Sequence, residues 1–395
     1  MYCAFTLPPM NKKKGYTFRK FINDLHLWLG IASALVLFIV CLTGTIYTFK
    51  SEIEGFIEPD KYALRGAEVK PYDVDALTNF VALESGLQVQ RITISNEPLK
   101  PLQFSVTAKE KGKRGETLYV DPYKRELLGT GKGPASEFFM MVFKLHRWLL
   151  LDTAIGRPIV GWATVIFVLL SISGLILWFP KKIKGWKSLK PGFKIKFQAK
   201  WKRINHDLHN ALGFYSLLLI LVMSFSGLCW SFEWYRDGLS VVLGTKVFDR
   251  TEEPLESVAI EGKSALTLKE ALAIADNLLD YEARTTTVSL PKDETGVIEV
   301  QKNDIKRFNE TVFDKVYIDQ YSGDIVKVDY FGDKSLGEML AAQIKPLHLG
   351  TIYGMFSKVL YFIVCLIATS LPITGIIIWL NKMKKKKKCN NTTAV

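Results

Sequence analysis

Residues 24–49, which read DLHLWLGIASALVLFIVCLTGTIYTF, decide the fold of this 395-residue chain. From residue 27 to residue 49 this stretch contains no Asp, Glu, Lys or Arg. At 1.5 Å per residue, a helix of such a length crosses a hydrocarbon core of about 30 Å. Three later stretches share the property: residues 159–179, 211–232 and 359–380. We therefore predict four membrane-spanning helices.

A short phrase ending in Leu-His precedes each apolar stretch. The four phrases are Asp24-Leu25-His26, Lys144-Leu145-His146, Asp207-Leu208-His209 and Pro346-Leu347-His348. The first and third histidines each lie 18 residues before a glycine in a small-residue cluster, Gly44 and Gly227. The second and fourth lie 28 and 27 residues before Gly174 and Gly375. Two short spacings that alternate with two long ones predict a duplicated two-helix unit.

The basic residues predict the orientation. Residues 1–20, 180–203 and 381–395 are rich in Lys and Arg and contain no Asp or Glu. By the positive-inside rule both termini and the middle connection are cytoplasmic, and the two long connections are extracytoplasmic. The net charge of +13 then reflects topology and contact with anionic lipid. Nucleic-acid binding is not expected.

The two long connections each predict a small α+β domain. In the second, a capping box at residues 267–270 opens a helix, and strands are expected at residues 287–290, 297–301, 312–318 and 324–330. In the first, a helix is expected at residues 74–83, and strands at 89–94, 102–106 and 116–120. The predicted fold is thus an all-α membrane domain with two extracytoplasmic α+β domains.

This reading divides the chain into eight parts. They are the cytoplasmic N-terminus with the first span (1–49), the first extracytoplasmic domain (50–135), an interfacial helix with the second span (136–179), the basic connection (180–210), the third span (211–232), the second extracytoplasmic domain (233–345), an interfacial segment with the fourth span (346–380) and the basic tail (381–395).

All five histidines lie at span edges, and the predicted outer domains contain none. The orientation places His26 and His209 at the cytoplasmic face and His146 and His348 at the opposite face. One pair per face suits two haem irons, each held axially by two imidazoles, and with both axial positions filled the natural task is electron transfer. Zinc normally takes three or four ligands. The alternative is that each histidine is an interfacial side chain with its ring among the lipid headgroups.

Further residues are candidates for these sites. Gly30 and Gly213 each follow a histidine by four residues, so they share its helix face and would admit a porphyrin, although helix packing explains them equally well. His206 is an alternative ligand or a support for His209. Arg147 and Arg157 flank the second span and are candidates for pairing with haem propionates. No Cys-x-x-Cys-His is present, so the expected haems are b-type.

The four spans, the Leu-His phrases and the two segments Tyr119-Val120-Asp121-Pro122 and Tyr317-Ile318-Asp319 resemble the PepSY-associated transmembrane family. That family includes inner-membrane ferrisiderophore reductases. The resemblance therefore implies that the chain lies in the inner (cytoplasmic) membrane of a bacterium and that the two outer α+β domains are PepSY-like and periplasmic. The resemblance implies a transmembrane haem oxidoreductase with two b-type haems, which passes electrons outward to a ferric siderophore. It also carries the axial ligand roles over to the histidines of the four Leu-His phrases.

Two alternatives come from other classes of protein: an iron or siderophore permease, and a haem-free regulator whose outer domains bind a partner. The permease is disfavoured because no predicted span contains a carboxylate. The electron donor is not encoded, since the chain has no Gly-x-Gly-x-x-Gly motif between a strand and a helix. A quinol, a soluble flavin or a separate reductase would have to supply the electrons.

Overall fold

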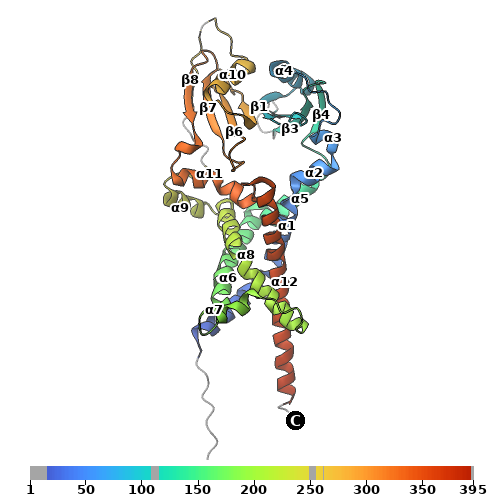
Figure 1. The fold of residues 1–395 in the computed structure, drawn as a ribbon, viewed down its shortest axis with the longest axis vertical. Coiled ribbons are helices and arrows are strands. Elements are labelled where there is room, and N and C mark those ends of the chain that lie inside the picture. The colour runs from blue at the N-terminus through green and yellow to red at the C-terminus, as the bar shows by residue number, and fades with distance from the viewer. Residues whose placement is uncertain (1–15, 108–114, 249–254, 261, 393–395) are drawn as a thin grey trace, which may run out of the picture. The chain divides into compact units, whose positions relative to one another are not determined.

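The computed structural model describes residues 16–107, 115–248, 255–260 and 262–392 (Figure 1). By its internal contacts the chain forms two compact units, which are described separately. The helical unit comprises residues 1–38, 162–221 and 367–395. The sheet unit comprises residues 39–161 and 222–366.

Four helices in the described residues are long and apolar enough to cross a membrane, as predicted. They are α1 (Phe18–Tyr47), α6 (Thr153–Trp178), α8 (Trp201–Ser231) and α12 (Gly354–Thr392). Each begins several residues before its predicted apolar stretch. His26, His206 and His209 therefore lie inside α1 and α8, where the helix geometry fixes the directions of their side chains.

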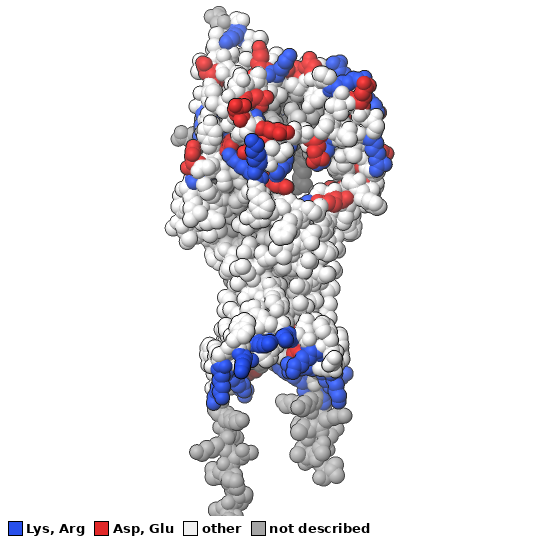
Figure 2. Space-filling model, in the orientation of Figure 1, with Lys and Arg blue, Asp and Glu red and all other residues white. Residues whose placement is uncertain are grey.

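In the helical unit, a short segment covers the end of α6. It consists of α7 (Trp186–Leu189) and the 3-10 turn η1 (Lys190–Phe193). Trp178, near the end of α6, stacks on Phe214 with ring centroids 4.1 Å apart. Arg19 donates hydrogen bonds of 2.6 and 2.8 Å to two carbonyl groups at the end of α6, which have no helical partner of their own. Figure 2 shows that Lys and Arg side chains gather around this end of the unit.

The sheet unit contains one antiparallel sheet of eight strands, in the order β4-β3-β2-β1-β5-β6-β7-β8. The first half contributes α4 (Val74–Ser85), β1 (Gln88–Ser95), β2 (Leu102–Thr107), β3 (Glu116–Asp121) and β4 (Glu126–Thr130). The second half contributes α10 (Leu268–Leu278), β5 (Ala283–Ser289), β6 (Val297–Asp304), β7 (Asp314–Asp319) and β8 (Ile325–Asp329). Each half thus has one helix followed by four strands.

The two predicted α+β segments share this sheet, because β1 pairs with β5 over five residues on each strand. The predicted helices and the capping box of Thr267 with Glu270 are confirmed, whereas β4 was not predicted. Both helices pack on the same core as the strands. The Asp75 carboxylate of α4 also accepts hydrogen bonds from the backbone N–H groups of Leu268 and Lys269 in α10. The two halves are therefore joined through strands and helices alike.

Shorter helices connect the sheet to the spans within this unit. They are α2 (Lys50–Ile57), α3 (Pro59–Tyr62), α5 (Pro134–Trp148), α9 (Glu233–Leu243), the 3-10 turn η2 (Phe331–Asp333) and α11 (Leu336–Leu349). The helices α5 and α11 carry His146 and His348.

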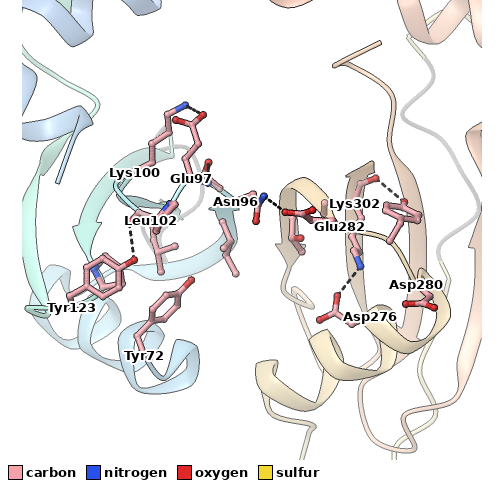
Figure 3. A pocket seen from close by; sticks show the side chains of 17 residues that line it. Tyr72, Asn96, Glu97, Lys100, Leu102, Tyr123, Asp276, Asp280, Glu282 and Lys302 are labelled. Carbon is pink, nitrogen blue, oxygen red and sulfur yellow. Dashed lines mark hydrogen bonds and ion pairs between the residues drawn. The ribbon is translucent and has the colours of Figure 1, made fainter. Parts of the chain in front are cut away.

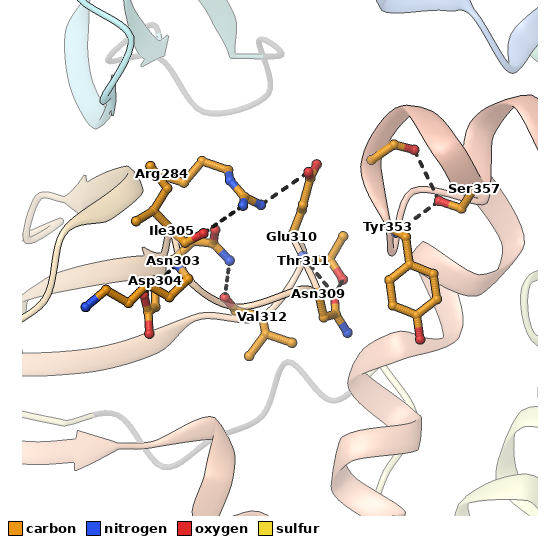
Figure 4. A network of polar contacts seen from close by, with 12 residues as sticks. Arg284, Asn303, Asp304, Ile305, Asn309, Glu310, Thr311, Val312, Tyr353 and Ser357 are labelled. Atoms are coloured by element: carbon orange, nitrogen blue, oxygen red, sulfur yellow. Dashed lines mark hydrogen bonds and ion pairs between the residues drawn. The ribbon is translucent and has the colours of Figure 1, made fainter.

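The loop between β6 and β7 carries a network of polar contacts (Figure 4), and further contacts from this loop fix α11 to the sheet. Asn309 and Thr311 both hydrogen-bond the side chain of Gln343 on α11, at 3.1 and 2.8 Å. Glu310 donates its backbone N–H to the carbonyl of Ile352, in the turn between α11 and α12, and pairs with Arg284 of β5. The helix that carries His348 is thus held by polar contacts to the sheet.

We predict that Ile92→Ala in β1 loosens both halves of the sheet. Ile92 is fully buried and pairs with the equally buried Val288 of β5, so its truncation should cost about 2–5 kcal/mol of unfolding free energy. Hydrogen exchange should accelerate in β5 and β6 as well as in β1 and β2. Leu83→Ala is the matched control, because that leucine is 85% exposed on α4. Acceleration confined to the first four strands would show that the halves open independently.

Candidate functional site

In the helical unit, His26 of α1 faces His209 of α8. Their ring centroids are 6.4 Å apart and their planes cross at 89°. The Nδ1 atom of His26 lies 2.9 Å from Ser173 Oγ on α6, and that of His209 lies 2.8 Å from Thr374 Oγ1 on α12. Each ring is therefore held from behind by a hydroxyl group on a neighbouring helix.

A cavity of about 740 Å³ surrounds His26 and His209, which we call the inner pair. Gly30 and Gly213, which the sequence placed on the histidine faces of their helices, both line it. A Cβ added at either glycine would meet only one leucine methyl at 3.7 Å, so both positions leave open space. Basic side chains also line the cavity: Arg19, Lys20, Lys181, Arg203 and Lys382.

In the sheet unit, His146 of α5 faces His348 of α11, with ring centroids 6.2 Å apart and an interplanar angle of 60°. The Nδ1 atom of His146 lies 2.9 Å from the carbonyl oxygen of Val40 and 3.2 Å from Thr43 Oγ1, both on α1. The Nδ1 atom of His348 lies 2.9 Å from the carbonyl oxygen of Met223 and 3.1 Å from Ser226 Oγ, both on α8. His146 and His348, which we call the outer pair, thus repeat the arrangement of the inner pair.

Each of the four rings rests on a hydroxyl residue followed by glycine. The four seats are Thr43-Gly44 under His146, Ser173-Gly174 under His26, Ser226-Gly227 under His348 and Thr374-Gly375 under His209. A Cβ on these glycines would lie 3.0–3.5 Å from the Cε1 atom of the ring, in ordinary contact at three seats and tighter than usual at Gly227. The sequence analysis used these glycines only as markers of duplication and missed the hydroxyl residues, although each of the four apolar stretches contains one Ser/Thr-Gly pair.

The seats also fix the tautomer of each histidine. Every one of the four hydroxyl groups donates its own proton to a carbonyl four residues earlier in its helix, at 2.7–3.0 Å. The hydroxyl oxygen can then only accept from the imidazole, so Nδ1 carries the proton and Nε2 keeps a free lone pair. Metal-bound histidines in proteins usually have this arrangement, with the N–H of the second nitrogen donated to a neighbouring acceptor.

The spacing of the rings matches two ligands of one metal ion. Two metal–imidazole bonds of about 2.0 Å would separate the nitrogens by about 4 Å, with each ring extending outward from there. The observed centroid distances of 6.4 and 6.2 Å agree with that geometry. Among the described residues no group of three or more His, Cys, Asp or Glu side chains could hold a metal ion. Each centre offers two nitrogens, so it suits an ion whose other ligands come with a cofactor.

The family of the chain can be identified at this point. A model described as the PepSY-associated TM region matches residues 24–382. The chain belongs to this family. No curated protein matches it. The matched segment begins at Asp24, two residues before the first histidine, and ends at Lys382, so this PepSY-associated protein contains all four histidine seats within the family region.

The remaining candidate residues lie around these pairs. His206 is exposed, lines the rim of the inner cavity and lies 3.7 Å from the Asp207 carboxylate, so His209 is the ring that faces His26. Arg147 lies over the ring of Phe143 at 5.3 Å. Burial and then the nearby charge of Arg157 lower the pKa of Arg147. Within the described part of the chain, neither Arg147 nor Arg157 has a carboxylate partner.

A second cavity of about 740 Å³ lies in the sheet unit (Figure 3). Both halves of the sheet line it, with Asn96 donating a 2.8 Å hydrogen bond across to Glu282. Its two lysines are already paired: Lys100 with Glu97, and Lys302 with Asp276. The cavity is therefore a polar groove whose cations are neutralised by its own walls.

We predict that the outer pair makes the cofactor-free protein less stable in acid. Burial, followed by the neighbouring His146, lowers the pKa of His348 from 6.5 to about 4, and burial also lowers the pKa of His146. The folded state therefore holds both rings neutral, while the unfolded state binds protons near pH 6.5. Stability should be complete above that pH and should fall by about 3 kcal/mol from His348 alone between pH 6.5 and 4.

Denaturant titrations at pH 7 and pH 4 of the protein without any bound cofactor measure this loss. The His348→Leu variant is the control, because it removes the titrating group and should show a smaller loss. Equal losses in the two proteins would contradict the assignment.

Proposed function

We propose that this PepSY-associated membrane protein binds two b-type haems, one between His26 and His209 and the other between His146 and His348, and carries electrons across the membrane. The observation that supports the proposal most is the pair of facing imidazoles in each unit, at 6.4 and 6.2 Å, with every Nδ1 proton already engaged. Haem supplies reversible one-electron chemistry at iron, and imidazoles on both axial positions leave no site there for oxygen or substrate.

The chain's own residues would bind and orient the cofactor. The Ser/Thr-Gly seats hold each ring through its Nδ1 atom, which leaves the Nε2 lone pair free to bind iron. Gly30 and Gly213 leave room for the macrocycle in the inner cavity. Propionates there would meet the basic side chains of the cavity wall, such as Arg203 and Lys382. At the outer pair, Arg147 and Arg157 would serve this purpose, since neither guanidinium is neutralised by a carboxylate of the described chain.

The proposed direction is outward, from a cytoplasmic donor to a periplasmic acceptor, and the proposed acceptor is a ferric siderophore. This part rests on the charge distribution and on the family resemblance. The donor is a quinol, a flavin or a separate reductase. A permease would not require four histidines seated in the same way, and a haem-free regulator would not require rings spaced for a shared metal ion. Both alternatives therefore fit the geometry less well.

The first prediction concerns haem content. Purified protein should contain close to two b-type haems with a low-spin spectrum, because nitrogen fills both axial positions. His26→Ala or His209→Ala should remove one haem, and His146→Ala or His348→Ala the other. Pyridine haemochrome assays and visible spectra measure the stoichiometry.

His206→Ala is the matched control for His209→Ala, because the two residues lie one turn apart on α8. The control should keep both haems. Full haem content in His209→Ala would move the ligand role to His206, and absence of haem from the wild-type protein would refute the proposal. Loss of both haems in every single variant would indicate misfolding.

The second prediction concerns the acceptor. Dithionite-reduced protein should be re-oxidised by a ferric siderophore, with one electron leaving the protein for each ferric ion that becomes ferrous. A ferrous chelator traps and quantifies the product. His348→Ala should lose this activity while its inner haem can still be reduced. If several chemically different ferric siderophores all leave the wild-type haem reduced, the acceptor assignment is wrong and the electron-transfer assignment stands on the haem measurements alone.

A further inference from the structure

The helix α9 exposes an apolar face. Trp234, Val241 and Val242 are 62%, 82% and 80% exposed. Their spacings of seven and eight residues place them on one side of the helix. Exposure of single apolar residues is ordinary, but a continuous apolar stripe on a short helix indicates a binding surface.

The helix α2 has the same property in the first half of the chain. Phe56 is 87% exposed. Ile53, one turn earlier in the helix, is 37% exposed, and Ile57, the next residue, is 53% exposed. Both helices also occupy equivalent places in the chain. The first residue of α2 is Lys50, just after α1 ends at Tyr47, and the first residue of α9 is Glu233, just after α8 ends at Ser231. Each apolar face therefore directly follows a membrane span.

Other residues of these two helices contact the helices that carry the outer histidines. On α9, Leu239 and Leu243 pack against a cluster that includes Ile344 of α11. A Cβ on Gly337 of α11 would lie 1.8 Å from the carbonyl oxygen of Leu243, so only glycine permits this approach. On α2, the Lys50 ammonium lies over the Phe139 ring of α5 at 5.9 Å. Thus α9 supports the helix of His348, and α2 supports the helix of His146.

We propose that α2 and α9 lie in the headgroup layer of the bilayer, with Phe56, Ile57, Val241 and Val242 directed toward the acyl chains. In this position they hold α5 and α11, and with them the outer histidine pair, at the membrane surface. The occupant is assigned as lipid because each face continues directly from a membrane span, where acyl chains end and headgroups begin. Trp234 belongs to the residue type that concentrates at this boundary.

The charges on these helices are compatible with that position. On α2, Lys50 pairs with Glu54, and Glu52 pairs with Lys358 of α12. On α9, Arg236 lies 3.7 Å from Asp237. Among the described charges of the two helices only Glu233, the first residue of α9, has no ion-pair partner, so near lipid this carboxylate must stay hydrated among the headgroups. The inference does not depend on haem binding.

A nitroxide label tests the proposal in nanodiscs that each hold one copy of the full chain. Phe56→Cys and Val242→Cys carry the label in a background in which Cys3 and Cys389 are serine, and the labelled background provides the blank for the remaining cysteines. Leu83→Cys is the matched control, because Leu83 is as exposed as Val242 but lies on α4, over the sheet. Power-saturation measurements compare the access of molecular oxygen, which concentrates in lipid, with that of a water-soluble nickel chelate.

We expect the labels at positions 56 and 242 to be relaxed more by oxygen than by the nickel chelate, and the label at position 83 to show the reverse. Nickel access at positions 56 and 242 equal to that at position 83 would place both helices in water and overturn the proposal. Low access of both reagents, with an immobilised label, would mean that protein covers these faces, and would overturn it too. Haem content and reductase activity do not enter either measurement, so this inference can fail while the proposed function holds.

Discussion

The constraint on which the candidate sites depend is the contact between a histidine ring and a Ser/Thr-Gly pair on another helix. The glycine lets the ring lie close to the helix backbone, most closely at Gly227, where a Cβ would come within 3.0 Å of the Cε1 atom of His348. The hydroxyl residue matters because its O–H donates a hydrogen bond to the helix backbone, and its oxygen accepts a hydrogen bond from the Nδ1–H of the ring. Steric fit and tautomer are thus fixed by two adjacent residues, which explains how four helices can present four rings in the same chemical form.

This contact also links the helices in a reciprocal way. The helix α1 carries the ring of His26 and, near its other end, the seat of His146, while α6 carries the seat of His26. The same exchange joins α8 with α11 and α12 through His209 and His348. Each of α1 and α8 therefore carries one ring and one seat, so both helices contribute residues to both histidine pairs. The sheet also joins two parts of the chain, because the pairing of β1 with β5 makes one core from two short α+β segments.

The sequence was sufficient for features that depend on local composition. Uncharged stretches of more than 20 residues predicted the four spans, and the Thr267 capping box predicted the start of α10. The pairing of β1 with β5 could not be predicted, since strand patterns reveal which residues alternate but not which edges meet. The hydroxyl seats were missed for a related reason. Ser173 is five residues from the end of α6 and far from His26 in sequence, so its role is visible only when α1 and α6 lie side by side.

The unequal spacings in the sequence have a structural cause. His26 and Gly44 lie on one uninterrupted helix, as do His209 and Gly227, which accounts for the short spacing of 18 residues. His146 and Gly174 lie on different helices, because the helical backbone is interrupted between α5 and α6. Leu149 and Leu150 in this interruption adopt left-handed backbone angles of φ 57° and 59°. The equivalent break between α11 and α12 uses Gly350 at φ 68°. Leucine is disfavoured in that conformation, so contacts with the surrounding structure must stabilise the backbone of Leu149 and Leu150 between α5 and α6. The inner rings are thus fixed by continuous spans, whereas the outer rings lie on separate short helices whose positions depend on the sheet and on α2 and α9.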